Sequence, residues 1–237
     1  MKQSKRNEQT TSEYENAGGI PQLVETADGL ALCDGDRIMI GDFSDMIPRL
    51  TPQRLQEEML VRAAKLKNFD GIPILADATA GMGEDSLILA AAGFCVHMYE
   101  YDKIIAALLE DSLKRAMLSP GLQGVVSRMH LHCEDSIAAM NGGFGGEFTP
   151  DVILLDPMFP KRTKSALVKK KFQLLQQLEK PCDNEDELLE AALSVKPQKI
   201  VIKRPLKGPY LAGRKPDYSL EGKAIRYDCI INIQSLY

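Results

Sequence analysis

The segment 156–160 combines a carboxylate, an aromatic ring and two prolines in a pattern that suits chemistry on a flat amine. It follows the short apolar run 152–155, which predicts a strand buried on both faces, as in a parallel sheet. Ligands of open α/β sheets bind just outside the carboxyl ends of the strands. The prolines restrict the backbone, so we expect Asp156 and Phe159 to lie in a stiff loop at such an edge.

An exocyclic amine of guanine or adenine is a poor nucleophile, because its lone pair is delocalised into the ring. Asp156 is placed to accept one N–H and the carbonyl of Pro157 to accept the other, which favours localisation of the lone pair toward a methyl donor. Phe159 would stack on the base, a contact typically worth ~1–3 kcal/mol, provided that the base is unpaired or flipped out. The alternative role of Asp156 is a helix cap after an ordinary strand.

A second motif, from Asp77 to Gly83, follows the apolar run 72–76 and precedes a helix predicted over 84–92. Its glycines let the backbone pass close to a ligand. The third glycine of a dinucleotide turn is missing, which disfavours a pyrophosphate and thus a nicotinamide-dependent dehydrogenase. Asp77 would instead place an anion near an ammonium group. A tight turn with no ligand is the alternative.

Two further acids follow predicted strands. Glu100 ends the strand 94–99, a place from which an acid binds ribose hydroxyls. S-adenosylmethionine offers both an ammonium and a free ribose. Asp135 ends the strand 128–133 and could accept from an adenine amino group or, equally, cap the helix that starts at Ser136. The predicted cofactor contacts are Asp77, Ala78, Thr79, Gly81, Gly83, Glu84, Asp85, Glu100, Tyr101, Asp135 and Asp156.

Basic residues are concentrated in two places, although the net charge is −4. Six lie in 161–171 and four in 199–207, with no acid in either segment. We favour contacts to RNA phosphates over a merely solvated helix face. The predicted contacts are Lys161, Arg162, Lys164, Lys169, Lys170, Lys203 and Arg204.

The remaining chemistry-bearing residues indicate no metal site and no membrane. His130 and His132 share a strand face while Cys133 points the other way, and no fourth ligand is evident. The five cysteines lack CxxC spacing, which is typical of reduced thiols in a cytoplasm. No apolar run is long enough to span a bilayer, and the polar segment 1–16 resembles neither a signal peptide nor an anchor.

The elements that must position these residues alternate between strands and helices, which predicts a doubly wound α/β sheet. A small antiparallel element is expected over 23–43, because Asp28-Gly29 and Asp34-Gly35 are hairpin signals. A helix is expected from Pro52 to Lys67, with Thr51 as N-cap. Further helices are predicted over 103–118 and 184–193, and strands over 199–203 and 227–233.

Three stretches together resemble the bacterial 16S rRNA (guanine-N2)-methyltransferase J family: DATAGMGEDSLILAAAGF, LLDPMFPKRTKSALVKK and VIKRP. The resemblance covers most of the chain from Asp77 onward, and DPMFP with KSALVKK is its most specific part. It implies a Rossmann-like class I methyltransferase sheet, S-adenosylmethionine as the donor and a guanine N2 of 16S rRNA in the small ribosomal subunit as the acceptor. The N-terminal third departs from the family pattern, as does Asp135, where a shorter side chain is usual.

The resulting organisation is a flexible tail over 1–20, a β-hairpin and helix extension over 21–68 and a methyltransferase domain over 69–237. Other acceptors stay open: adenine N6 in RNA or DNA, or a protein glutamine, which the basic residues disfavour. A non-catalytic RNA-binding assembly protein is the third possibility, although such a protein would be expected to lose Asp156 or the glycines. The sequence carries no signal for an oligomeric state.

Overall fold

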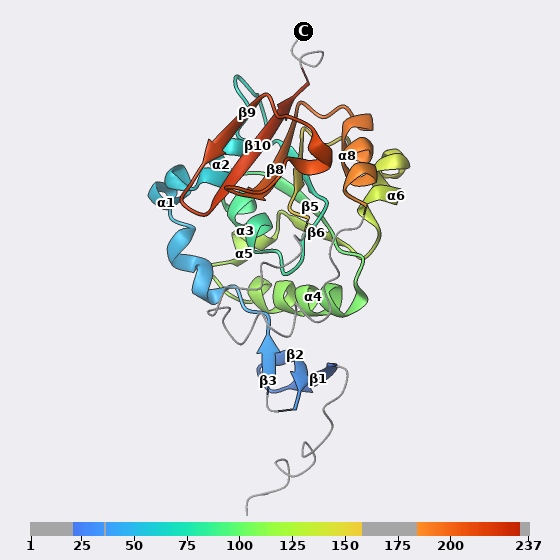
Figure 1. Ribbon diagram of the computed structural model, residues 1–237. Helices are drawn as coiled ribbons and strands as arrows, with labels where there is room; N and C mark the ends of the chain where they lie inside the picture. Colours follow the sequence, from blue (N-terminus) through green and yellow to red (C-terminus); the bar gives the residue numbers. More distant parts are fainter. Residues whose placement is uncertain (1–20, 36, 158–183, 233–237) are drawn as a thin grey trace, which may run out of the picture.

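A computed structural model describes residues 21–35, 37–157 and 184–232 of the 237-residue chain. Figure 1 shows a large twisted sheet with helices on both faces and a small separate sheet beyond helix α4. The predicted α/β class with a small N-terminal antiparallel element is confirmed. No helix within these ranges is long and apolar enough to cross a membrane.

The large sheet has seven strands in the order β6-β5-β4-β7-β8-β10-β9. The five strands from β6 to β8 run parallel, and β10 lies antiparallel to both β8 and β9. Their bounds are β4 Ile74–Asp77, β5 Cys95–Tyr99, β6 Met129–His132, β7 Val152–Leu155, β8 Lys199–Pro205, β9 Tyr218–Glu221 and β10 Ile225–Ile231.

The order of the strands reverses between β4 and β7. From β4 the chain proceeds outward through β5 to β6, and it then returns to place β7 on the other side of β4. Such a switch point leaves a crevice at the carboxyl ends of the two strands, where ligands of α/β sheets bind. Both predicted motifs follow these strands, so the topology brings them together.

Two hydrophobic layers bury the sheet. On one face, α3 (Glu84–Ala91), α2 (Met59–Ala64) and α5 (Gln123–Val126) pack on side chains such as Leu75 and Leu154. On the other face, α6 (Ser136–Asn141) and α8 (Glu185–Ser194) cover Ile153 and Ile200. β7 is buried along its whole length, which confirms the prediction from its apolar run.

The N-terminal sheet is antiparallel and has three strands, β1 Gln22–Thr26, β2 Gly29–Asp34 and β3 Arg37–Ile40. It packs through Leu32 and Met39 on Ile105 and Leu108 of α4 (Lys103–Met117). Met82, from the turn after β4, joins this cluster. The small sheet therefore supports the turn from below in the view of Figure 1.

The predicted helix from Pro52 to Lys67 is wrong as a single element. It is divided into α1 (Pro52–Glu57) and α2, because Glu58 adopts an extended conformation with ψ near 120°. The carboxylate of Glu58 accepts hydrogen bonds from the Arg49 guanidinium at 2.9 and 3.0 Å. Pro52 begins α1 as expected, but the Thr51 side chain makes no capping hydrogen bond.

The other elements differ from the predictions only at their ends or by omission. The first parallel strand begins at Ile74, since Ile72 is 66% exposed and precedes Pro73. Two short elements, α5 and β9, were not predicted, because four residues give too little periodicity for a pattern to show. The short 3-10 turns are η1 Ser44–Arg49, η2 Gly143–Gly146 and η3 Leu211–Gly213.

Candidate active site at the carboxyl edge of the sheet

The turn between β4 and α3 is shaped by two glycines with left-handed backbones. Gly81 has φ 53° and Gly83 has φ 75°. A Cβ on Gly83 would lie 2.8 Å from Cδ1 of Leu109, whereas a Cβ on Gly81 would meet nothing within 4 Å. Gly83 therefore suits a left-handed backbone that other residues rarely adopt, and a side chain there would also displace Leu109 of α4. Gly81 leaves open space above the turn. This space fits a cofactor that approaches the backbone closely.

Glu100 ties this turn to the end of β5. Its Oε2 accepts the N–H of Gly81 at 3.1 Å, and its Oε1 accepts the N–H of Asp102 at 2.8 Å. Asp102 in turn caps α4 by accepting the N–H groups of Ile104 and Ile105. Tyr101, the residue after Glu100, is 63% exposed. Glu100, the acid predicted to bind ribose, thus also holds the turn between β4 and α3 in place.

Asp77 lies under the turn and is only 1% exposed. Its carboxylate accepts the hydroxyl of Ser86 at 2.6 Å and the N–H of Thr79 at 3.2 Å. Burial raises the pKa of Asp77 to about 7, although the Ser86 hydrogen bond opposes this rise. Its donors are neutral, so nothing among these contacts balances its charge. A cationic ligand group near the turn would do so.

The acceptor motif is joined directly to the cofactor turn. The N–H of Asp156 donates to Oγ1 of Thr79 at 2.6 Å, and the N–H of Ala78 donates to the carbonyl of Leu154 at 3.0 Å. Pro157 is buried. The structure thus brings the two predicted motifs together. Phe159, the predicted stacking ring, lies outside the described residues.

Lys203 takes a place that the sequence did not predict. Its Nζ lies 2.9 Å from Oδ2 of Asp156 and 2.6 Å from Oδ2 of Asp85, at the first turn of α3. In this conformation Lys203 pairs with the site carboxylates instead of standing free on an RNA-contacting surface. The sequence did offer a signal for this ion pair. A lysine within an apolar strand is usually paired, and the neighbouring strand is followed by an acid.

Arg204 is buried in the structure and does not lie on an exposed surface where RNA could bind. Its residue is 1% exposed, and its guanidinium donates to the carbonyl of Pro209 at 3.0 Å and to Glu185 at 3.1 Å. Arg204 therefore fastens α8 and the loop after β8 to the sheet. The other predicted RNA contacts, Lys161, Arg162, Lys164, Lys169 and Lys170, lie outside the described residues.

Asp135 and Glu84 lie at the starts of helices. Asp135 is exposed and accepts the N–H of Ile137 at 2.8 Å, which confirms the capping alternative. Glu84 is the exposed first residue of α3, where a carboxylate interacts favourably with the helix dipole. Their contacts to the cofactor stay predictions.

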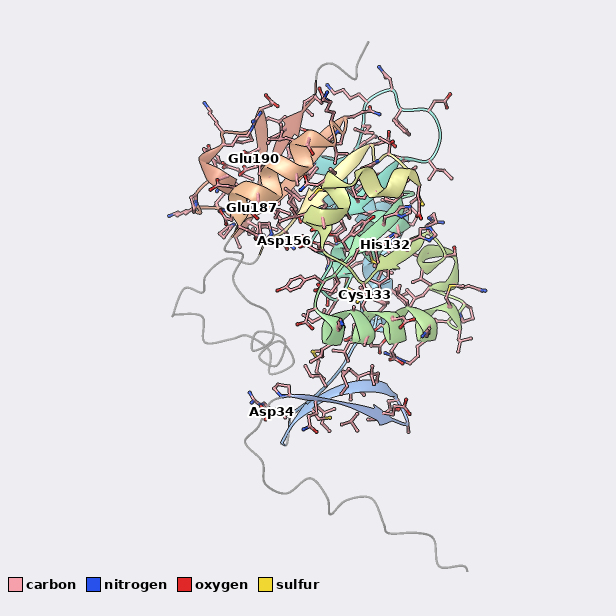
Figure 2. All side chains as sticks on the ribbon, turned by 90° about the vertical axis from the view of Figure 1, so that its right-hand side faces the viewer. Asp34, His132, Cys133, Asp156, Glu187 and Glu190 are labelled. Atoms are coloured by element: carbon pink, nitrogen blue, oxygen red, sulfur yellow. The ribbon has the colours of Figure 1, made fainter. Side chains whose placement is uncertain are left out.

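The histidines gather away from this site, on β5 and β6 at the edge of the sheet. His130 and His132 share a face as predicted, and Nδ1 of His97 lies 3.0 Å from Nε2 of His132. The ligand atoms of Cys95, His97 and His130 lie within 4.8 Å of one another, so Cys95 replaces the weighed Cys133 in this group. Burial, with the two neighbouring rings, lowers the pKa of His97 to about 4. Figure 2 shows His132 and Cys133 apart from Asp156.

Comparisons with known proteins agree with this geometry. Residues 18–232 match the family model described as "Putative SAM-dependent methyltransferase". Proteins named "Ribosomal RNA small subunit methyltransferase J" from Nitrosococcus oceani and Pseudomonas aeruginosa are 43% and 46% identical over 73% and 66% of this chain. The matched segments span 67% and 59% of those relatives' own lengths.

A solved structure shares the fold across nearly the whole chain. The crystal structure of a SAM-dependent methyltransferase from Neisseria gonorrhoeae superposes with a TM-score of 0.73 at 29% identity, covering 91% of this chain and 85% of that one. An rRNA methyltransferase from Streptomyces viridochromogenes, 18% identical with a TM-score of 0.53 over 78% of this chain and 87% of its own, shows the fold alone. The chain belongs to the SAM-dependent methyltransferase family, within the group of ribosomal RNA small subunit methyltransferase J proteins, and S-adenosylmethionine is its cofactor.

Proposed function

We propose that this chain methylates the exocyclic N2 amino group of a guanine in 16S rRNA of the small ribosomal subunit. The observation that carries the proposal is the junction of Asp156 and Thr79, which fixes the acceptor motif against the cofactor turn at 2.6 Å. The names of the curated relatives supply the class of acceptor.

The site residues divide the work between the two substrates. Gly81, with Glu100 behind it, leaves room for S-adenosylmethionine, which when bound supplies a methyl group on a sulfonium. Asp156 accepts an N–H of the acceptor amine and then its proton, because the nitrogen must lose one proton after it has used its lone pair. The carbonyl of Pro157 is the second acceptor. Most of the rate enhancement in such a displacement comes from positioning.

The partner and the compartment follow from the acceptor. We infer that the protein acts in the cytoplasm, because its proposed substrate is the small ribosomal subunit. The free thiols Cys33, Cys95, Cys133 and Cys229, among the described residues, support this. The basic segment 161–171 follows the acceptor motif directly, so we assign it, with its lysines and Arg162, to contacts with RNA phosphates.

The test uses S-adenosylmethionine with a labelled methyl group and small ribosomal subunits from a strain that lacks the gene. The label is mapped by nuclease digestion and mass spectrometry. We expect N2-methylguanosine at a single guanine of 16S rRNA. Label on an adenine or on a ribosomal protein would contradict the proposed acceptor, and no label with cofactor still bound would contradict the activity toward the subunit.

A further inference from the structure

Lys203 bridges two carboxylates from different parts of the fold. Its ammonium lies 2.6 Å from Oδ2 of Asp85 and 2.9 Å from Oδ2 of Asp156. We call Asp85, Asp156 and Lys203 the charge triad. The side chains of Lys203 and Asp85 are each 24% exposed, and that of Asp156 is 39% exposed. The triad therefore lies at the open edge of the site with limited access to water.

The topology determines this meeting. β7 and β8 are parallel neighbours in which Leu155 lies beside Ile202. The next residue of β7's chain, Asp156, follows the end of that strand, whereas Lys203 is still within β8 beside it. Asp85 comes from the first turn of α3, immediately after the glycine turn. The cofactor turn and the acceptor motif are thus joined by one cation as well as by the hydrogen bond from the N–H of Asp156 to the Thr79 hydroxyl.

The charges around Asp156 oppose one another. Burial raises the pKa of Asp156, Lys203 lowers it by its charge and its hydrogen bond, and Asp85 raises it again. Burial works against the charge on Lys203, but the two carboxylates outweigh it and raise the pKa of Lys203. The other ionisable groups that face the triad are Asp77 under the turn, Tyr227 on β10 and Arg204 on β8.

Only one oxygen of Asp156 is engaged by this cation. The ammonium of Lys203 contacts Oδ2. Within the described ranges, Oδ1 receives neither a hydrogen bond nor an ion pair. Oδ1 is thus the atom that is available to an incoming amine, while Oδ2 fixes the orientation of the carboxylate.

We propose that Lys203 is a positioning residue for methyl transfer: held by Asp85, it keeps Asp156 ionised and directs Oδ1 toward the acceptor amine. The inference rests on the function proposed above and adds to it the residues that prepare its proton acceptor. The acceptor nitrogen forms a bond to the methyl carbon, the C–S bond breaks with its electrons left on sulfur, and one N–H proton passes to Oδ1. Asp156 must therefore begin as an anion.

Two single substitutions test this role because they shift the ionisation of Asp156 in opposite directions. Lys203→Met removes the cation, so the acidic limb of the kcat profile moves to higher pH, and kcat at neutral pH falls by about 100-fold. Asp85→Asn removes an anion, so the limb moves to lower pH and kcat falls by about tenfold or less. Lys203→Arg keeps the charge and retains the limb of the wild type.

Two further variants provide controls. Lys114→Met removes an exposed lysine that pairs with Glu110 on α4 and makes no contact with the charge triad, so it leaves the profile unchanged. The double variant Asp85→Asn with Lys203→Met keeps the net charge of the triad. It therefore still tests the role of Lys203 if the variant Lys203→Met alone does not fold. In the double variant the pKa of Asp156 lies between those of the wild type and Lys203→Met.

The same shifts are measured without turnover by ¹³C NMR titration of the Asp156 carboxyl group in the free protein, and cofactor binding is followed by calorimetry with S-adenosylhomocysteine. We expect opposite shifts in the two single variants. In Lys203→Met the affinity for S-adenosylhomocysteine should change by less than about threefold. Shifts in the same direction, no shift, or equal losses of cofactor affinity and kcat would overturn the role of Lys203. A wild-type protein that does not methylate 16S rRNA would contradict the proposed function alone, because the titration still decides the inference.

Discussion

The two halves of the site hold their carboxylates in different ways. On the cofactor side, Asp77 and Glu100 are 1% and 8% exposed, and hydroxyl and backbone N–H groups donate to them. On the acceptor side, Asp156 is more open and shares a lysine with Asp85. The cofactor half therefore lacks a cation among these donors and gains one when an ammonium binds. The acceptor half already contains its cation and retains one net negative charge, which a proton can neutralise.

The largest effect is expected from breaking the acceptor half alone. Asp156→Ala removes the group that accepts the N–H and the proton, so kcat should fall by about 10³-fold or more. The affinity for S-adenosylhomocysteine, measured by calorimetry, should change by less than about threefold, because the glycine turn remains. Equal losses of turnover and affinity would show that the two halves are not separate.

Breaking the glycine turn should instead affect stability and cofactor binding together. Gly83→Ala places a Cβ 2.8 Å from Leu109 at φ 75°, so the free energy of unfolding should fall by about 1–2 kcal/mol. Urea unfolding provides the measurement. Gly124→Ala is the matched control, since its Cβ meets nothing within 4 Å in α5 and should stabilise the helix. A similar loss in both variants would contradict a specific need for glycine at position 83.

The pH dependence of cofactor binding sharpens the comparison further. With a pKa of about 7, Asp77 is largely protonated at pH 6 and ionised at pH 8. An ammonium nearby favours the ionised form, so the affinity for S-adenosylhomocysteine should rise by several-fold between these values and then level off. Asp77→Asn should bind more weakly and with a flat profile. A pH-dependent profile that persists in Asp77→Asn would assign the titration to another group.

The same raised pKa predicts a slope in stability. Between the ordinary pKa of 3.8 and about 7, the folded protein holds a proton at Asp77 that the unfolded chain has lost. The contribution of Asp77 to the free energy of unfolding therefore decreases as the pH rises through this window. Urea unfolding of Asp77→Asn should show a smaller decrease over the same range than the wild type. An unchanged slope would contradict the assignment.

The smallest effect is expected at Asp135, which caps α6 and was also predicted to contact the adenine of the cofactor. Asp135→Ala removes the cap of α6 and should lower the free energy of unfolding by about 1 kcal/mol, while Asp135→Ser keeps a capping oxygen and should restore most of it. A contact with the adenine amino group would reduce cofactor affinity in both variants. Urea unfolding and calorimetry separate the two roles. Full affinity in both variants would remove Asp135 from the cofactor site.

The sequence predicted the elements of the large sheet well, because buried strands such as β7 are continuous apolar runs and their helices begin at recognisable turns. It also predicted which acids end the strands. It did not predict that Lys203 reaches Asp85 and Asp156, since this contact depends on the strand order and on the register of β7 against β8. Arg204 was misplaced for a related reason: a cation at a strand end can face inward and pair with a helix such as α8.

The break at Glu58 shows a different limit. The apolar spacing of 55–66 continues through it, so periodicity predicts one helix. The break coincides with the ion pair between Glu58 and Arg49, whose positions are nine residues apart and outside any helical pattern. Hydrophobic patterns thus indicate which face is buried more reliably than they indicate where the backbone bends.

A crystal structure with S-adenosylhomocysteine would test the central claim most directly, namely that the carboxyl edge between β4 and β7 is the site of methyl transfer. We predict ligand density in the open space above Gly81, bounded by Glu100, with the sulfur on the side of Asp156. Density elsewhere, for example in the hollow lined by Ile38 and Ile40 of the small sheet and Arg115 of α4, would contradict the account.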